Sequence, residues 1–426
     1  MKLATLSLFA LFAAACDGAA PPAARDEAAL ATPMPIQHVV VVVKENHTFD
    51  NYFGSFPGAE GTTTCVTPTD PTPHACPHAP DRTPRDLCHE HDCALTDWHQ
   101  GAMDGWGAVA GSTQNGDDLA WAQYGEADIP NYWAWARRYT LADHFFADEL
   151  GPSFPGHLFV LAAQAGWATG NPNTDFFHPY WGCDQTFWSR VDVLQNGGPT
   201  VESVFPCFDI PSLPDVLPAG VDWKFYGSNF YVLPEIWSMF DAVSGVRYGS
   251  GWDHVVNVTQ FDDDIRNHTL PAVSWLVDQD LADEHPGVGG VCAGENWTVS
   301  HLDPLLASDY WSSTAILITM DDFGGWYDHV APPRQYGGDP KTQPYGLGFR
   351  LPLIIVSPYA KPHYVYDKVA EQASIPRFIE RVFGATQTLH DLDPAARDAQ
   401  ANDLMDAFDF RQPPKPPLVL PLRLCL

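Results

Sequence analysis

The run Ile36-Gln-His-Val-Val-Val-Val-Val43 is short, apolar and rich in β-branched residues, and it continues through Lys44 into Glu45-Asn46. A second run of the same kind, Thr314-Ala-Ile-Leu-Ile-Thr-Met320, leads into Asp321-Asp322. Runs of this kind are typical of strands that are buried on both faces of a parallel sheet. The two stretches therefore predict an α/β fold in which each polar pair follows a buried strand.

Both polar pairs are expected to lie at one edge of the sheet, because sites in open α/β sheets form at the carboxyl ends of the strands. Three carboxylates and one amide oxygen would then share a small volume, which requires a cation. Oxygen ligands favour Ca²⁺, Mg²⁺ or Mn²⁺ over Zn²⁺. Asp321-Asp322 alone would more often form a solvated turn, but the occurrence of two such pairs favours a single divalent metal site.

The composition narrows the class of protein. The chain has 426 residues, 45% hydrophobic and 18% charged, which is enough for one large α/β domain. Its formal net charge of -31 repels nucleic acid at long range, so a nucleic-acid partner is not expected. A substrate that carries phosphate would need a local cation to be held.

The N-terminus has the pattern of a targeting segment. Lys2 precedes an apolar stretch from Leu3 to Phe12, which is too short to span a bilayer as a helix, and Ala13-Ala-Ala-Cys16 follows. The end resembles the lipobox of bacterial lipoproteins, with Cys16 as the lipidated residue; the alternative is an ordinary signal peptide. We expect residues 1–16 to form the signal peptide, with Cys16 as the lipid-bearing residue in the lipoprotein case. The protein is expected to be exported, either lipid-anchored in the periplasm or at the cell surface, or secreted.

Eight cysteines follow Cys16, and an even number in an exported chain favours disulfides. The spacing of Cys88 and Cys93, close to His89 and His91, also allows a zinc site, which we consider the weaker alternative. Proximity in the sequence favours three pairs: Cys65 with Cys76, Cys88 with Cys93, and Cys183 with Cys207.

Other segments give coarser expectations. Residues 62–86 are rich in Thr, Pro, Cys and His and predict a stapled surface loop, whereas residues 128–149 are expected to be helical. Leu351-Pro-Leu-Ile-Ile-Val-Ser357 predicts another buried strand. The stretch from Ser374 to Gly384 predicts a helix, with Ser374 as its cap and Gly384 as its stop.

Two long motifs resemble one protein family. Glu45-Asn-His-Thr-Phe-Asp-Asn-Tyr-Phe-Gly54 is similar to E-N-R-S-F-D-H-Y-F-G, a signature of the bacterial phospholipase C / acid phosphatase family, which is a branch of the alkaline-phosphatase-like fold. The chain departs from it at His47, Thr48 and Asn51. Asp321-Asp-Phe-Gly-Gly-Trp-Tyr-Asp-His-Val-Ala-Pro-Pro333 matches the family's D-[DE]-x-G-G-x-Y-D-H-V-x-P-P.

Shorter matches supply reactive residues. Gly151-Pro-Ser-Phe-Pro-Gly156 resembles the family's G-P-[ST]-x-P-N-R, which places Ser153 at the position of the nucleophile. Gly156-His157 stands where the family has Asn-Arg, so a cation is lost there. The position of His89 before Met103, and His285 within Glu284-His-Pro286, match two further site histidines.

The resemblance implies a mainly parallel central sheet flanked by helices, with loop-rich cap insertions. It implies that Ser153 attacks phosphorus and forms a phosphoserine, while His89 and His285 hold phosphoryl oxygens or protonate the departing alcohol. The residues expected to hold the metal ion are Glu45, Asn46, Ser153, Asp321 and Asp322.

Several residues near these motifs have open or minor roles. Asp50 and His329 are expected to support the metal ligands from behind without binding the ion. For His329 the alternative is equally open: its ring either braces the loop through hydrogen bonds or binds the metal ion directly. His47, His91 and His157 have no clear counterpart in the family and are expected to be incidental.

The resulting hypothesis is an exported, metal-dependent phosphoesterase that acts like a phospholipase C on phospholipids. An acid phosphatase acting on soluble phosphomonoesters is the alternative. A non-catalytic surface lipoprotein that binds a cation or a phosphorylated ligand is an alternative of another class. We expect a flexible spacer at residues 17–34, a phosphoesterase domain at 35–412 and a proline-rich tail at 413–426.

Overall fold

The structure is a computed structural model that describes residues 34–174, 181–198, 200–229, 236–278, 280–333 and 346–425. The predicted signal segment with Cys16 and almost all of the predicted spacer lie outside the described residues. Residues Pro35–Leu426 form one compact unit. Among the described residues, no helix combines the length and the apolar character needed to cross a membrane.

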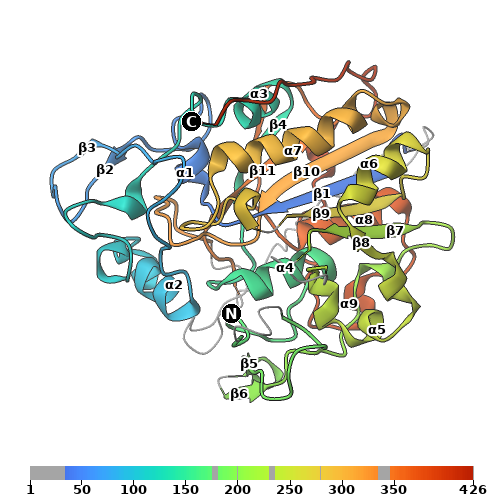
Figure 1. The fold of residues 1–426 in the computed structure, drawn as a ribbon, viewed down its shortest axis with the longest axis horizontal. Coiled ribbons are helices and arrows are strands. Elements are labelled where there is room, and N and C mark those ends of the chain that lie inside the picture. The colour runs from blue at the N-terminus through green and yellow to red at the C-terminus, as the bar shows by residue number, and fades with distance from the viewer. Residues whose placement is uncertain are drawn as a thin grey trace, which may run out of the picture. The chain divides into compact units, whose positions relative to one another are not determined.

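A nine-stranded mixed sheet forms the centre of this unit (Figure 1). β13 (Ala370–Glu371) pairs only with β4. From one edge to the other, the remaining strands are β12 (Tyr364–Tyr366), β4 (Thr140–Phe146), β11 (Arg350–Val356), β10 (Thr314–Met320), β1 (His38–Lys44), β9 (Val273–Val277), β7 (Trp223–Gly227) and β8 (Val255–Asn257).

The sheet is mainly parallel, which confirms the predicted fold class. β1 pairs in parallel with β10 and β9, and β11 runs antiparallel to both of its neighbours. β10 and β11 are buried along their whole length, as expected for strands covered on both faces.

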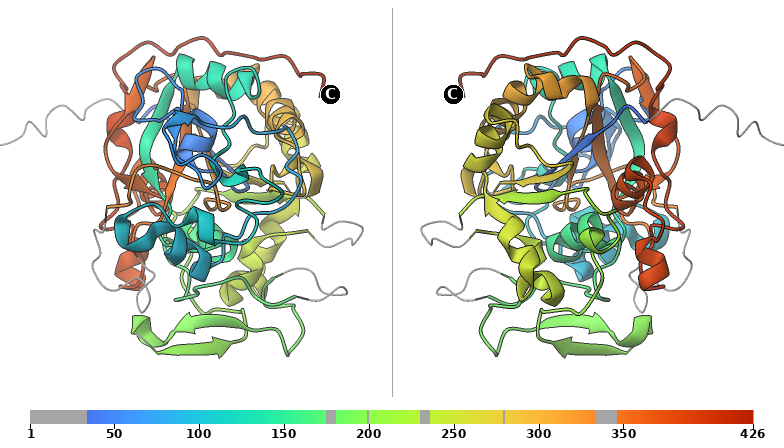
Figure 2. Two further views of the ribbon diagram at one scale, coloured as in Figure 1. Left: turned by 90° about the vertical axis from the view of Figure 1, so that its left-hand side faces the viewer. Right: turned by 90° about the vertical axis from the view of Figure 1, so that its right-hand side faces the viewer.

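Helices cover both faces of the sheet. Figures 1 and 2 show α7 (Val291–Leu306) and α6 (Thr259–Arg266) on one face, and α8 (Ser374–Phe383) on the other. The other α-helices among the described residues are α1 (Phe49–Phe53), α2 (His91–Trp98), α3 (Pro130–Arg138), α4 (Ser153–Ala162), α5 (Ser244–Arg247) and α9 (Leu389–Leu392).

Two small hairpins lie outside the main sheet. β2 (Thr64–Cys65) pairs with β3 (His74–Ala75) inside the predicted stapled loop, and β5 (Val191–Leu194) pairs with β6 (Val201–Val204). The three disulfides expected from proximity are present. A fourth disulfide joins Cys292 in α7 to Cys425.

The prediction for residues 128–149 is wrong in its second half. α3 ends at Arg138, and residues 140–146 form β4, which pairs with β11 on one side and with β12 and β13 on the other. Partners on both sides of a buried strand outweigh local preference, so a helical expectation fails there. The predicted helix at 374–384 is found as α8 and stops at Gly384 with φ 69°, but Ser374 is its first helical residue and Ala373 is its cap.

The proline-rich C-terminal segment is fastened to the same unit. Trp135 Nε1 donates a hydrogen bond to Leu418 O at 3.0 Å. Trp311 Nε1 donates a hydrogen bond to Lys415 O at 2.7 Å. In Figure 1 the red segment passes over α3.

Candidate active site

Two neighbouring strand ends bring the polar pairs together. β1 and β10 are parallel, with Lys44 opposite Met320, so Glu45 and Asp321 are the next residues on adjacent strands. Asp321 N donates to Lys44 O at 3.0 Å, and Asn46 Nδ2 donates to Asp322 Oδ2 at 3.4 Å. The separation of almost three hundred residues along the sequence is therefore closed by a single strand pairing.

α4 delivers the predicted nucleophile to these carboxylates. Ser153 is the first residue of α4, and its Oγ donates to Asp322 Oδ2 at 2.9 Å. A Cβ atom at Gly156 would come within 2.1 Å of Asp321 O, so only glycine allows the first turn of α4 to lie against the end of β10. Asn171 Oδ1 accepts a hydrogen bond from Phe154 N at 2.9 Å and further fixes this turn.

His157 was expected to be incidental to the site, but it lies at the same strand ends as the polar pairs. Its Nε2 is 3.5 Å from Asp321 Oδ2 and 3.6 Å from Glu45 Oε1. One ligand atom from each of these three side chains lies within 4.8 Å of the other two. The sequence carried a signal for this placement, because residues i and i+4 of a helix share a face and His157 is four residues after Ser153.

The charges of the cluster are unbalanced within the described residues. Burial raises the pKa of Asp321 well above its usual range, and Asp322 and Glu45 add to the rise. Burial, followed by repulsion from Asp283 and Asp322, raises the pKa of Glu45 to about 8. The protein thus disfavours the ionised carboxylates unless a cation is supplied.

Unpaired polar atoms show that the residues fit a divalent cation. Asn46 Oδ1, Asp321 Oδ2 and His157 Nε2 are buried and have no hydrogen-bond partner within the described part of the chain. Buried polar atoms in proteins nearly always have a hydrogen-bond partner. An ion bound between these three atoms would explain why they have none. The candidate ligand groups are carboxylates, an amide oxygen, a hydroxyl and an imidazole.

His89 and His285 lie beside this cluster. Their ring centroids are 5.5 Å apart, and His89 Nε2 is 3.3 Å from Asn46 Nδ2. The Nδ1 atom of His89 is 2.7 Å from Leu87 O, and that of His285 is 2.8 Å from Pro286 O. Hydrogen bonds from Nδ1–H to these carbonyl groups leave Nε2 of each ring to accept or donate a proton.

A buried ion pair that was not predicted from the sequence lies next to Glu45 and His285 in the chain. Lys44 Nζ lies 3.5 Å from Glu284 Oε1, and both side chains are fully buried. Tyr52 Oη donates to Glu284 Oε2 at 2.5 Å. Lys44 directly precedes Glu45, and Glu284 directly precedes His285. The ion pair therefore holds the backbone next to these two site residues in place.

Asp50 and His329 belong to a second buried cluster. Arg350 is fully buried; its Nη2 donates to Asp50 Oδ1 at 3.1 Å and its Nε donates to Asp328 Oδ1 at 3.0 Å. His329 Nδ1 lies 2.6 Å from Asp50 Oδ2. In this arrangement His329 braces the loop against Asp50, which is one of its two expected roles.

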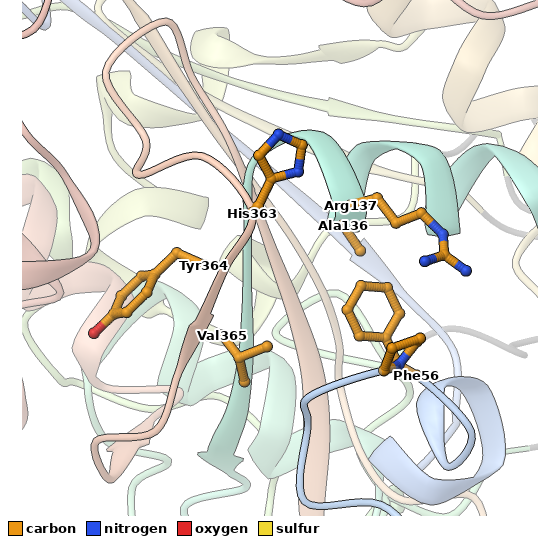
Figure 3. A pocket seen from close by; sticks show the side chains of 7 residues that line it. Phe56, Ala136, Arg137, His363, Tyr364 and Val365 are labelled. Atoms are coloured by element: carbon orange, nitrogen blue, oxygen red, sulfur yellow. The ribbon is translucent and has the colours of Figure 1, made fainter.

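Two pockets differ in their relation to the site. The pocket of about 260 Å³ at β12 is lined by Phe56, Arg137, Tyr364 and their neighbours, and none of the predicted site residues lines it (Figure 3). A polar pocket of about 540 Å³ is lined by Glu90 and Asn171, among others. Glu90 follows His89, and Asn171 holds Phe154 N, so the larger pocket adjoins the site.

The sequence of this chain is similar to those of known proteins. A model of the Phosphoesterase family matches residues 36–386. A non-hemolytic phospholipase C from Pseudomonas aeruginosa is 27% identical over 90% of this chain and 58% of its own length. Phospholipase C A from Mycobacterium tuberculosis is 27% identical over 89% of this chain and 78% of its own length. The chain thus spans little more than half of the first of these relatives.

Among the solved structures that are similar to this chain is a protein of the alkaline phosphatase superfamily from Vibrio parahaemolyticus. It has a TM-score of 0.36 and 11% identity, and the match covers 83% of this chain and 68% of that chain.

Proposed function

The chain belongs to the Phosphoesterase family, and from that premise we propose that it hydrolyses phosphate esters with Ser153 as the nucleophile. The observation that carries this proposal is the 2.9 Å hydrogen bond from Ser153 Oγ to Asp322 Oδ2, within a buried acidic cluster at two strand ends. A serine hydroxyl needs an activating partner before it attacks, and this contact provides one.

The proposed reaction has two steps. Ser153 Oγ attacks phosphorus and gives its proton to Asp322, while the bond from phosphorus to the alcohol oxygen breaks. His285 protonates the departing alcohol through Nε2; His89 is less free to do so because its Nε2 faces the Asn46 amide. In the second step His285 takes a proton from water, and the water oxygen attacks the phosphorus of the phosphoserine. The bond from phosphorus to Ser153 Oγ breaks, Asp322 returns its proton to Oγ, and the phosphate product leaves.

A divalent cation fits among Glu45, Asn46, Ser153, Asp321 and Asp322, and we propose that these residues hold one. When bound, such an ion neutralises charge on the phosphoryl oxygens and lowers the pKa of a serine hydroxyl. Positioning and charge stabilisation account for most of the rate enhancement in phosphoryl transfer.

We propose phospholipids as the substrate class, in the manner of a phospholipase C, because the two relatives described above carry that name. The polar pocket beside Asn171 would receive the part of the substrate beyond the phosphate. Export is part of the proposal; the four disulfides support it, since such bonds persist in oxidising compartments.

The test compares Ser153→Ala with wild type on phosphatidylcholine vesicles and on p-nitrophenyl phosphate. We expect a loss of at least about 10⁴-fold on the better substrate, as for other nucleophile deletions. Ser312→Ala is the control, because within the described residues its hydroxyl donates only to Asp309 O in its own turn. Full turnover by Ser153→Ala would refute the nucleophile, and mass spectrometry of quenched wild-type enzyme should detect one added phosphoryl group on Ser153.

The two substrates also separate the alternatives. Preference for the vesicles supports a phospholipase C, and preference for p-nitrophenyl phosphate supports a phosphatase of soluble monoesters. Failure of the wild type on both, with a cation still bound, would indicate the non-catalytic binding protein.

A further inference from the structure

We infer that His157 is a direct ligand of the cation, so that this centre has mixed nitrogen and oxygen ligands and prefers Mn²⁺, Fe²⁺, Co²⁺ or Zn²⁺ to Ca²⁺ and Mg²⁺. The inference rests on the proposed function and concerns the same site. It adds a ligand that the oxygen-only set predicted from the sequence did not contain.

The distances around His157 are those of ligands that share an ion. Its Nε2 lies 3.5 Å from Asp321 Oδ2 and 3.6 Å from Glu45 Oε1. Ligand atoms bound at about 2.0–2.2 Å from one ion lie about 3–3.5 Å from each other. The same separations are long for direct hydrogen bonds, which have a usual length of about 2.9 Å.

The Nε2 atom of His157 faces the two carboxylates and has no competing hydrogen bond within the described residues. His157 is 3% exposed, and its Nε2 has no hydrogen-bond partner within the described residues. The nearer of these two carboxylate oxygens, Asp321 Oδ2, is also buried and has no hydrogen-bond partner in the described part of the chain. Trp237 packs edge-on against the imidazole with ring centroids 4.7 Å apart, which restricts the rotation of the ring.

The helix explains why this nitrogen reaches the site. Ser153 and His157 are one turn apart on α4, so they project from one face. Ser153 meets Asp322 while His157 meets Asp321. The close approach at Gly156, between them, holds this face against the end of β10.

The chemistry of the ligand determines the metal preference. Ca²⁺ and Mg²⁺ bind oxygen ligands, whereas imidazole suits first-row transition ions and Zn²⁺. His157 replaces the arginine of the family pattern G-P-[ST]-x-P-N-R, so the nitrogen ligand distinguishes this chain from that pattern.

The experiment measures metal affinity on metal-free protein, without reference to turnover. Wild type, His157→Gln and His38→Gln are titrated with Zn²⁺, Co²⁺, Mn²⁺, Mg²⁺ and Ca²⁺ against a fluorescent chelator. His38 is the matched control because it begins β1, at the opposite end of the strand from Glu45. Circular dichroism verifies that each variant is folded.

We expect His157→Gln to weaken Zn²⁺, Co²⁺ and Mn²⁺ binding about 10- to 100-fold, the range known for changes around metal ligands. Binding of Mg²⁺ and Ca²⁺ should change far less, and the visible absorption spectrum of the Co²⁺ complex should shift. His38→Gln should behave as wild type.

Unchanged Co²⁺ affinity and an unchanged Co²⁺ spectrum in folded His157→Gln would overturn the inference and leave the proposed function intact. If the variant does not fold, a wild-type preference for Mg²⁺ or Ca²⁺ over Zn²⁺ and Co²⁺ overturns it, and the reverse preference supports it. Failure of the wild type to bind any of the five ions would overturn both the inference and the metal-dependent function.

Discussion

Two of the buried carboxylate clusters in the described residues follow the same two strands, β1 and β10, and their charges are balanced in opposite ways. Asp50 and Asp328 surround the buried guanidinium of Arg350, which donates to both. Asp321 and Asp322 have no lysine or arginine in contact within the described residues, and their pKa values are raised mainly by burial. The presence or absence of a protein cation, rather than the number of carboxylates, therefore separates a structural cluster from a candidate metal centre.

The cluster around Arg350 also helps to position the candidate metal ligands. Asp50 N donates to Asp328 Oδ2 at 3.1 Å, and Thr48 Oγ1 donates to Tyr327 O at 2.9 Å. These bonds tie the loop after β1 to the loop after β10, a few residues beyond the candidate ligands. Arg350 is thus expected to hold the geometry of the site without entering it.

The largest expected effect on stability comes from Arg350→Met. It leaves Asp50 and Asp328 buried without their cation, which should lower the free energy of unfolding by about 3–5 kcal/mol. Urea unfolding measures the loss. Arg381→Met is the control: Arg381 is 55% exposed and pairs with Asp403 at 3.5 Å, and such surface pairs contribute about 0–1 kcal/mol. Equal losses for the two variants would break the comparison.

Removal of the metal should have the next largest effect. Wild type held at an ion concentration about 100-fold above Kd should lose about 2.7 kcal/mol of unfolding free energy when a chelator is added. Asp322→Asn should show almost no response, because the binding site is already impaired. A chelator that leaves the thermal unfolding of wild type unchanged would contradict the metal centre.

Neutralising one carboxylate in each cluster should change stability with opposite sign. In metal-free protein at pH 7, Asp321→Asn should raise the free energy of unfolding by at least about 1 kcal/mol, since each unit of raised pKa represents about 1.4 kcal/mol. The gain should be lost below the unfolded pKa of about 4, where the carboxylic acid is neutral in both states. Asp50→Asn should lower stability by about 1–3 kcal/mol, because its amide cannot accept all the bonds that the carboxylate accepts.

The smallest effect is expected for His329→Gln. The change removes the 2.6 Å contact of the ring with Asp50, which should be worth about 1 kcal/mol of unfolding free energy. Metal content should remain that of wild type. A loss of bound metal would show that His329 is a ligand, its other expected role, and would move this residue from one cluster to the other.

The sequence predicted the elements whose residues determine their own environment. The valine run of β1 and the apolar run of β10 were predicted as buried strands, and both form such strands in the structure. The pairing of their ends could be anticipated because parallel strands end at one edge of a sheet. Helix α8 was recognisable from its terminal Ser374 and Gly384.

Features that depend on distant partners could not be predicted in the same way. The residues of β4 were expected to be helical. They form a strand because they pair with β11, about two hundred residues later, and the local sequence does not reveal that partner. Lys44 and Glu284 are even further apart in the sequence, and no local motif links them. His157 was set aside because it departs from the family pattern, although its spacing from Ser153 on a helix placed it at the site.

The central claim is that the cluster at the ends of β1 and β10 binds a divalent ion which the Arg350 cluster does not. Elemental analysis of purified wild type, Asp322→Asn and Asp50→Asn tests it most directly. We predict one divalent ion per chain in wild type and in Asp50→Asn, and little metal in Asp322→Asn. Full metal content in Asp322→Asn, or an active wild type that contains no divalent ion, would contradict the account.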